Sequence, residues 1–102
     1  MKIEFYSEKK LKREILEILA RHLDLNDYKV FFFGSRVKET NFPRSDVDIG
    51  IEGPDEIPPP KFLAIKEELD NLPTLYSFDL VDFKNVPPDF KKETLKNVEP
   101  IN

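Results

Sequence analysis

The sequence predicts one α/β (α+β) domain, in which helices pack on a mixed sheet of three to four strands. Apolar residues recur at helical spacing in some segments and at strand spacing in others. These segments follow the order α-β-β-α-β-α, without an internal repeat or a linker. The length of 102 residues is close to the commonest size of a single domain, so we expect one domain over residues 1–102.

The first helix is expected to begin after Ser7, whose hydroxyl can cap it, and to run to about His22. Its apolar residues lie three and four positions apart and form one stripe: Leu11, Ile15, Ile18 and Leu19. His22 lies at the helix end, where we expect it to cap or to pack. Residues 28–33 then form an apolar strand that is expected to be buried on both faces.

The second strand, over residues 47–52, alternates strictly between apolar and other residues. Asp46, Asp48 and Gly50 project to one face. The apolar residues project to the opposite face, which we expect to be core: Val47, Ile49 and Ile51.

Prolines and apolar runs define the remaining elements. A loop with four prolines spans residues 54–60, and a helix follows over about 60–71 with proline in its first turn. Residues 75–83 contain a third strand. Pro87-Pro88 opens a last helix, and the contacts predicted for it are Phe90, Leu95 and Val98.

Composition excludes several classes of function. The net charge of −4 argues against binding nucleic acid by bulk charge, because phosphate backbones attract basic surfaces. No apolar run approaches the length of a membrane span. Without cysteine, the chain forms neither disulfides nor thiolate metal sites. We therefore expect a soluble cytoplasmic protein that does not bind membranes or nucleic acid directly.

Gly34-Ser35-Arg36 directly follows the first strand. Glycine has no side chain, so a phosphate can approach its backbone closely. Backbone N–H groups at a helix start bind anions, and Ser35 and Arg36 add a hydroxyl donor and a positive charge. By itself this signal is weak, because most Gly-Ser pairs after a strand are ordinary turns.

Asp46 and Asp48 are two residues apart in a strand, so their carboxylates lie on one face. Two such charges about 4 Å apart repel by roughly 4 kcal/mol at an effective dielectric constant of 20. Mg²⁺ relieves that repulsion and is often shared between carboxylates and phosphates. The alternative is an edge strand with two solvated acids, which the core pattern of the opposite face disfavours.

A third acid is expected in the strand within residues 75–83. An acid inside an apolar strand is costly unless it is paired or lies on an open face. Asp79 and Asp82 project to opposite faces, so only one of them can join Asp46 and Asp48. Asp82 lies near the strand end, where we expect an exposed acid.

The combined pattern resembles the nucleotidyltransferase superfamily typified by DNA polymerase β, and within it the minimal nucleotidyltransferases (MNT proteins). The resemblance covers nearly the whole chain. It consists of Gly34-Ser35-Arg36, nine further residues up to Ser45, then Asp46-Val47-Asp48, and the later Asp79. In the family the third acid precedes two apolar residues, as Asp79 does here, which favours Asp79 over Asp82.

The resemblance implies a nucleotidyltransferase fold and a site for ATP and two Mg²⁺ ions. The residues that match the catalytic, metal-binding acids are Asp46, Asp48 and Asp79. Those that match the triphosphate cradle and positions beside the phosphates are Gly34, Ser35, Arg36 and Ser45.

The resemblance also implies a partner. Larger relatives carry an extra domain for the acceptor, and this chain is too short for one. MNT proteins resemble the antitoxin half of MNT–HEPN pairs, in which AMP is attached to a tyrosine of a helical HEPN ribonuclease toxin. Two alternatives stay open: transfer to a small molecule or RNA with a separate acceptor-binding subunit, and a non-catalytic antitoxin that acts by contact alone.

Overall fold

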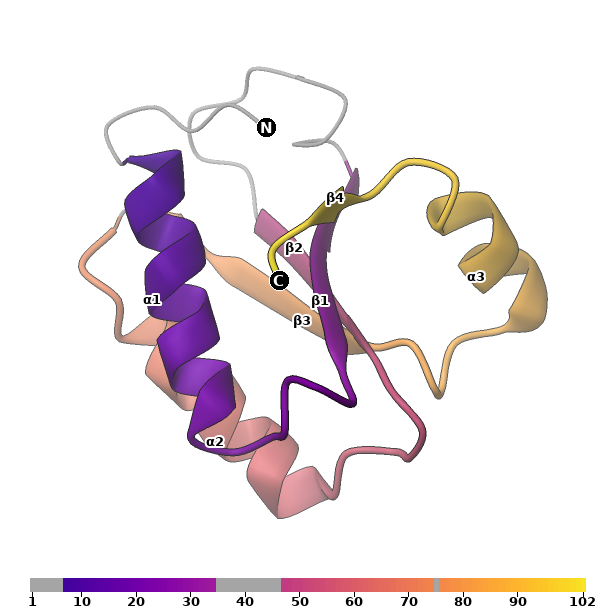
Figure 1. The fold of residues 1–102 in the computed structure, drawn as a ribbon, viewed down its shortest axis with the longest axis horizontal. Helices are drawn as coiled ribbons and strands as arrows, with labels where there is room; N and C mark the ends of the chain where they lie inside the picture. The colour runs from indigo at the N-terminus through magenta and orange to yellow at the C-terminus, as the bar shows by residue number, and fades with distance from the viewer. Residues whose placement is uncertain (1–6, 35–46, 75) are drawn as a thin grey trace.

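The computed structural model describes residues 7–34, 47–74 and 76–102. The helices are α1 (Glu8–Ala20), α2 (Pro59–Asp70) and α3 (Pro88–Thr94). The strands are β1 (Lys29–Phe33), β2 (Val47–Glu52), β3 (Phe78–Asp82) and β4 (Glu99–Pro100). Figure 1 shows these elements as a sheet with α1 and α2 on one side and α3 set apart from them. The predicted class and order of elements are confirmed, and the short β4 follows the last helix.

The first helix begins where its cap predicts. Ser7 Oγ accepts a hydrogen bond from the Lys10 backbone N–H at 3.3 Å, and such caps contribute about 1 kcal/mol. The helix ends at Ala20, before the predicted end near His22. The next two N–H groups bond to carbonyls only three residues earlier, which closes the helix with a tighter turn.

The sheet has the strand order β3-β2-β1-β4. β1 runs antiparallel to both β2 and β4, whereas β2 and β3 are parallel. A parallel pair requires a crossover connection, which α2 supplies between β2 and β3. The sheet is therefore mixed, as predicted.

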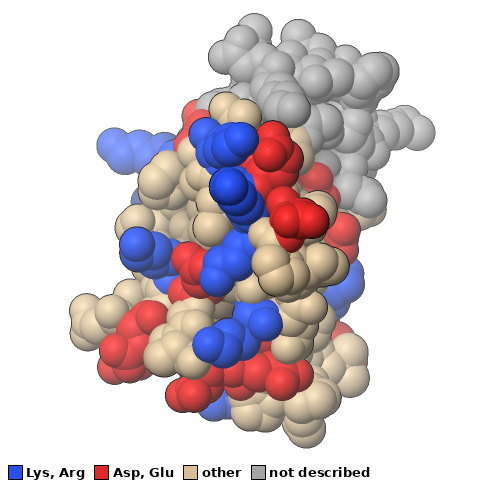
Figure 2. Space-filling model, turned by 90° about the vertical axis from the view of Figure 1, so that its right-hand side faces the viewer, with Lys and Arg blue, Asp and Glu red and all other residues tan. Residues whose placement is uncertain are grey.

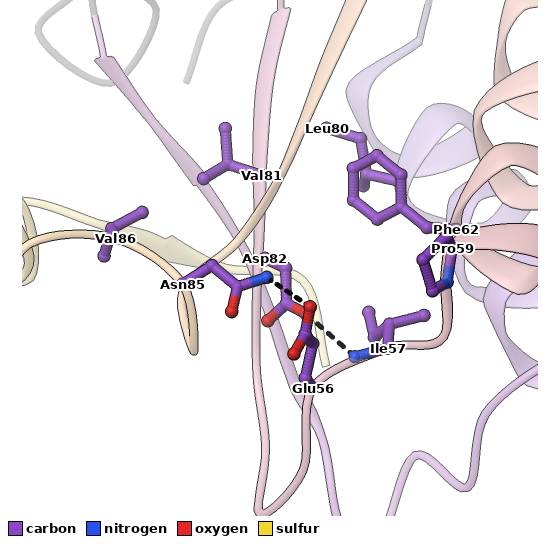
Figure 3. A pocket seen from close by; sticks show the side chains of 9 residues that line it. All are labelled: Glu56, Ile57, Pro59, Phe62, Leu80, Val81, Asp82, Asn85 and Val86. Carbon is purple, nitrogen blue, oxygen red and sulfur yellow. Dashed lines mark hydrogen bonds between the residues drawn. The ribbon is translucent and has the colours of Figure 1, made fainter.

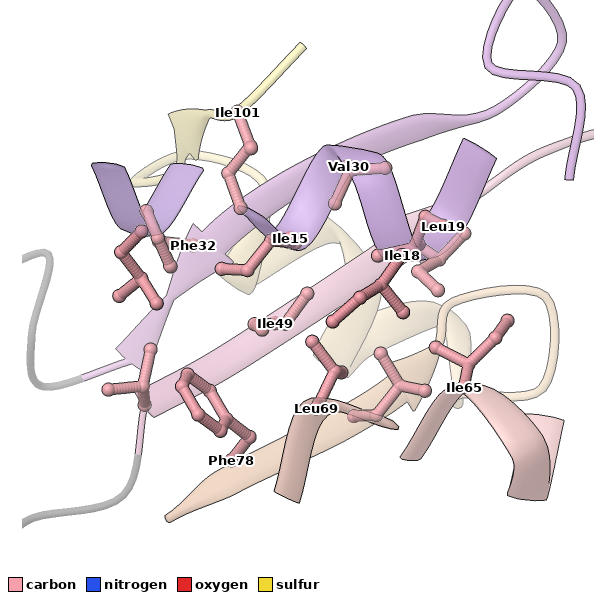
Figure 4. Packing of buried hydrophobic residues seen from close by; sticks show 14 of the residues in the cluster. Ile15, Ile18, Leu19, Val30, Phe32, Ile49, Ile65, Leu69, Phe78 and Ile101 are labelled. Carbon is pink, nitrogen blue, oxygen red and sulfur yellow. The ribbon is translucent and has the colours of Figure 1, made fainter. Parts of the chain in front are cut away.

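One face of the sheet packs against α1 and α2 (Figure 4). The alternate residues of β2 that were predicted as core have no exposed surface: Val47, Ile49 and Ile51. Leu11, Ile15 and Leu19 of α1 meet them from the helix layer and are also fully buried. Burying one such side chain stabilises the fold by about 1.5–3 kcal/mol, so this layer fixes the orientation of β2.

The opposite face carries a smaller aromatic cluster of Phe31, Phe33 and Phe83. The Phe83 ring meets those of Phe31 and Phe33 edge to face, with centroids 4.9 Å and 5.2 Å apart. Leu95 and Val98, predicted as contacts of the last helix, pack against this cluster just after α3. Apart from Lys29 at its start, β1 is thus buried on both faces, as predicted.

The fourth strand closes the other edge of the sheet. The Ile101 N–H donates to the Val30 carbonyl at 2.8 Å, and the Val30 N–H donates to Asn102 Oδ1 at 2.8 Å. The Asn102 side chain thereby extends the ladder beyond β4. Pro100 is tolerated because β4 is an edge strand.

None of the helices described in the structure is both long and apolar enough to cross a membrane. The side of the molecule shown in Figure 2 carries Lys and Arg side chains interleaved with Asp and Glu. An ion pair also joins α3 to the sheet, with Lys91 Nζ 2.7 Å from a Glu52 carboxylate oxygen. This side therefore has mixed charge instead of a surface of one sign.

Candidate active site

Gly34 follows β1 directly and adopts a positive φ of 82°, which favours glycine. A Cβ at this position would overlap the Asp48 carboxylate. The β1–β2 register explains this closeness, because it pairs Phe33 with Asp48. The absence of a side chain at Gly34 thus allows the Asp48 carboxylate to lie against the Gly34 backbone.

Asp48 and Asp79 are register partners in the parallel pair of β2 and β3. Both alternate with core residues, so both project from the face opposite α1 and α2. Asp48 is half-buried and Asp79 is exposed. Since adjacent strands lie about 4.8 Å apart, the two carboxylates are neighbours on an accessible face.

Asp82 is buried, with 8% of its surface exposed, so the expectation of an exposed acid was wrong. Its carboxylate accepts hydrogen bonds from the backbone N–H groups of Ile57 at 2.9 Å and Lys84 at 3.0 Å. Figure 3 shows this carboxylate beside the loop before α2, near the hydrogen bond between Asn85 and Glu56. Asp82 therefore anchors that loop on the helix side of the sheet, while Asp79 shares a face with Asp48.

Four predicted site residues lie outside the described residues: Ser35, Arg36, Ser45 and Asp46. Within the described part of the chain, no group of three or more acidic or histidine side chains is placed to hold a metal ion. Asp48 and Asp79 nevertheless supply adjacent carboxylate oxygens, and Asp48 lies against Gly34 at the end of β1. Oxygen donors of this kind suit Mg²⁺ that is shared with a phosphate group.

A cavity of about 340 Å³ adjoins the same turn. Phe33 and Gly34 form one wall, and the other wall comes from Phe90, Glu93, Thr94 and Asn97. From the sequence, Phe90 is predicted only as a packing contact, and no role is predicted for the other three residues. Glu93 and Thr94 lie three and four residues after Phe90 on one face of α3, and this helical spacing is the signal in the sequence for that part of the wall; Asn97 follows the helix end.

The single histidine lies away from these acids, at the junction of α1 and α2. His22 Nε2 and the Arg21 guanidinium both contact the Glu68 carboxylate. The hydrogen bond from Arg21, followed by that from His22, lowers the pKa of Glu68 below its ordinary value of 4.5. These contacts join α1 to α2 and agree with the packing role expected for His22.

Comparison with solved structures identifies the fold. The chain is 18% identical to a chain in a crystal structure of a toxin–antitoxin with AMP-PNP, with a TM-score of 0.75, covering 89% of this chain and 72% of that one. It is 14% identical to a chain in a complex of a tri-AMPylated Shewanella oneidensis HEPN toxin with an MNT antitoxin, with a TM-score of 0.72 and coverages of 94% and 72%. For a toxin–antitoxin MntA–HepT structure the identity is 15%, the TM-score 0.70, and the coverages 93% and 72%.

Comparison of sequences identifies the family. No curated protein matches the chain significantly. The family described as "Polymerase beta, Nucleotidyltransferase" matches residues 13–101, which include the turn and all the acids discussed above. The predicted resemblance is confirmed: the chain belongs to the polymerase β nucleotidyltransferase family.

Proposed function

We propose that this protein transfers AMP from ATP to a hydroxyl group, with release of pyrophosphate as the bond between the α- and β-phosphates breaks, and that the acceptor is a tyrosine of a HEPN-type toxin. One structural relationship carries the first part of the proposal. The turn at Gly34 contacts Asp48, and Asp48 lies opposite Asp79 on an accessible face of the sheet. A phosphate-binding turn beside paired carboxylates is what nucleotidyl transfer requires.

Asp48 and Asp79 would hold divalent metal together with Asp46, two residues before Asp48 in the sequence. We expect the metal to be Mg²⁺, because the donors are carboxylate oxygens, and we expect two ions because the resemblance to the family implies two. When bound, such ions lower the pKa of an attacking hydroxyl and stabilise charge on the phosphates.

The chain's own residues would orient the substrates. Gly34 has no side chain and so makes room for the Asp48 carboxylate, while the Ser35 hydroxyl, the Arg36 guanidinium and Ser45 would bind phosphate oxygens. Asp79 is more exposed than Asp48 and would orient the attacking hydroxyl and accept its proton.

The proposed acceptor rests on the structural comparisons. The similar chains come from toxin–antitoxin structures, and in one of these the HEPN toxin carries three AMP groups. With identities of 14–18%, these comparisons support a common fold and make a HEPN partner the first candidate to test.

The experiment mixes the purified protein with Mg²⁺, isotopically labelled ATP and the protein encoded by the neighbouring reading frame. Intact-mass and peptide mass spectrometry then measure AMP on the partner and locate the modified residue. Asp48→Asn and Asp79→Asn are the test variants. Asp55→Asn is the matched control, because Asp55 is an exposed acid in the loop before α2.

We expect the parent protein and Asp55→Asn to modify a tyrosine of the partner, and the two test variants to lose more than 100-fold in rate. Equal modification by Asp48→Asn and the parent would contradict the proposed site. A parent protein that blocks toxicity without transferring AMP would support an antitoxin that acts by contact alone. Transfer of AMP to RNA or to a small molecule would contradict the proposed acceptor, but the proposed nucleotidyltransferase activity would stand.

A further inference from the structure

Phe90 is one of two large hydrophobic side chains that are exposed in the described part of the chain, with 44% of its surface accessible. Two other rings hold it in place. The Phe33 ring lies 6.5 Å away at an interplanar angle of 87°, and the Phe83 ring lies 6.0 Å away at 37°. The aromatic cluster therefore supports one edge of Phe90 while much of the ring stays accessible.

This ring lines the cavity that Gly34 also lines. Phe33 connects them, since it precedes Gly34 in the chain and contacts Phe90 through its ring. A ligand whose phosphates lie at Gly34 therefore has an apolar aromatic surface within the same cavity. A nucleobase stacks on such a surface without regard to its identity, because every base has a π-face.

Polar groups line the rest of this wall. The Glu93 carboxylate accepts hydrogen bonds, the Thr94 hydroxyl both donates and accepts, and the Asn97 amide does both as well. Glu93 pairs with Lys96 at 3.2 Å. The Gly34 end of the cavity borders Asp48, which is proposed to hold Mg²⁺ together with the phosphates, so the triphosphate belongs at that end and the base belongs beside α3.

We propose that this cavity binds the base of the nucleotide, with Phe90 as the stacking surface and with Glu93, Thr94 and Asn97 facing its polar edge. The inference rests on the proposed function, because it requires a nucleotide whose phosphates bind at Gly34. A carboxylate acceptor favours bases with an exocyclic amino group, which adenine has and uracil lacks.

The test compares two ligands by calorimetry in the presence of Mg²⁺. AMP-PNP carries a base, and inorganic tripolyphosphate carries only the phosphates. We expect Phe90→Ala to weaken AMP-PNP binding about tenfold and tripolyphosphate binding less than twofold, because only AMP-PNP has a base that can stack on the ring. Phe90→Tyr keeps a ring and should bind AMP-PNP like the parent.

Two further variants separate the loss of stacking from a change in folding. Leu63→Ala truncates the other large exposed hydrophobic side chain, which lies on α2, and should leave both affinities unchanged. Phe90→Leu keeps apolar bulk for packing against Phe83 but removes the flat ring, so it should resemble Phe90→Ala in AMP-PNP affinity. Thermal unfolding of each variant confirms that the fold is retained.

The outcomes distinguish this inference from the proposed function. Failure of the parent to bind either ligand would overturn both. If the parent binds both ligands and Phe90→Ala changes neither affinity, or weakens both equally, the base lies elsewhere and the transferase proposal stands. If Phe90→Ala leaves AMP-PNP affinity unchanged but lowers the rate of partner modification, the Phe90 ring contacts the acceptor instead of the base. That result also overturns the inference.

Discussion

Asp48 of β2 lies directly opposite Asp79 of β3 in the parallel register, on the face of the sheet that α1 and α2 do not cover. Like charges that face each other across neighbouring strands destabilise a sheet. The core on the other face, where Ile49 and Leu80 are also register partners, holds both carboxylates in place despite their repulsion. This arrangement makes the pair a candidate cation site and leads to the first prediction.

Asp79→Asn is expected to stabilise the metal-free protein by about 1 kcal/mol, because it removes a repulsion between charges roughly 5 Å apart in a largely aqueous environment. The same variant should lose the rise in melting temperature that Mg²⁺ produces in the parent. Thermal unfolding with and without Mg²⁺ measures both effects. Asp55→Asn should behave like the parent, and a full Mg²⁺ response by Asp79→Asn would contradict the cation site.

Asp82→Asn is expected to have the opposite effect on stability, although Asp82 lies on the same strand as Asp79. The buried carboxylate accepts two backbone hydrogen bonds, and an amide NH₂ group cannot accept the second one. We expect a loss of about 1–3 kcal/mol in the free energy of unfolding. Urea unfolding measures the loss, and AMP-PNP affinity should stay within twofold of the parent. A stable Asp82→Asn with weakened nucleotide binding would place Asp82 in the site instead.

Gly34→Ala is expected to reduce both stability and nucleotide binding. A non-glycine residue at this positive φ costs about 1–3 kcal/mol, and the new Cβ would displace the Asp48 carboxylate. The matched control is Gly53→Ala, whose Cβ would overlap the Tyr28 ring, away from the acids. Calorimetry should show AMP-PNP affinity lost only in Gly34→Ala, whereas equal losses in both variants would indicate a general effect on folding.

The junction of α1 and α2 predicts a pH dependence of stability. Hydrogen bonds from Arg21, and then from His22, lower the pKa of Glu68 in the folded state below its ordinary value of 4.5. Glu68 therefore contributes stability that is fully present above about pH 4.5 and is lost as the pH falls through its folded-state pKa. In the Glu68→Gln variant, the loss of stability that Glu68 causes at low pH should be absent.

Urea unfolding of the parent and of Glu68→Gln between pH 3 and pH 7 tests this prediction. The stability difference between them should be largest near pH 7 and should shrink toward pH 3. Glu67→Gln is the control, because Glu67 is the exposed neighbour on the same helix. A difference between the parent and Glu68→Gln that does not change with pH would contradict the proposed linkage.

Much of this fold follows from local patterns in the sequence. Alternation over 47–52 predicts which side chains of β2 form the core, and the structure buries Val47, Ile49 and Ile51 completely. The cap at Ser7 predicts the start of α1. Such features depend on residues within a few positions of one another, so periodicity and capping reveal them. The last strand was not placed from the sequence, because β4 has two residues and depends on pairing with β1.

The sequence by itself determined that Asp79 and Asp82 face opposite ways and that Asp48 faces away from the core, because alternation is a property of the strand. Only the tertiary structure decided which acid joins Asp48. The parallel register of β3 with β2 places Asp79 beside Asp48 and buries Asp82 under backbone donors. The cavity between Gly34 and Phe90 has the same origin, since it arises where residues more than 50 positions apart pack together. Local spacing does not encode such packing, because it depends on how distant elements fit against one sheet.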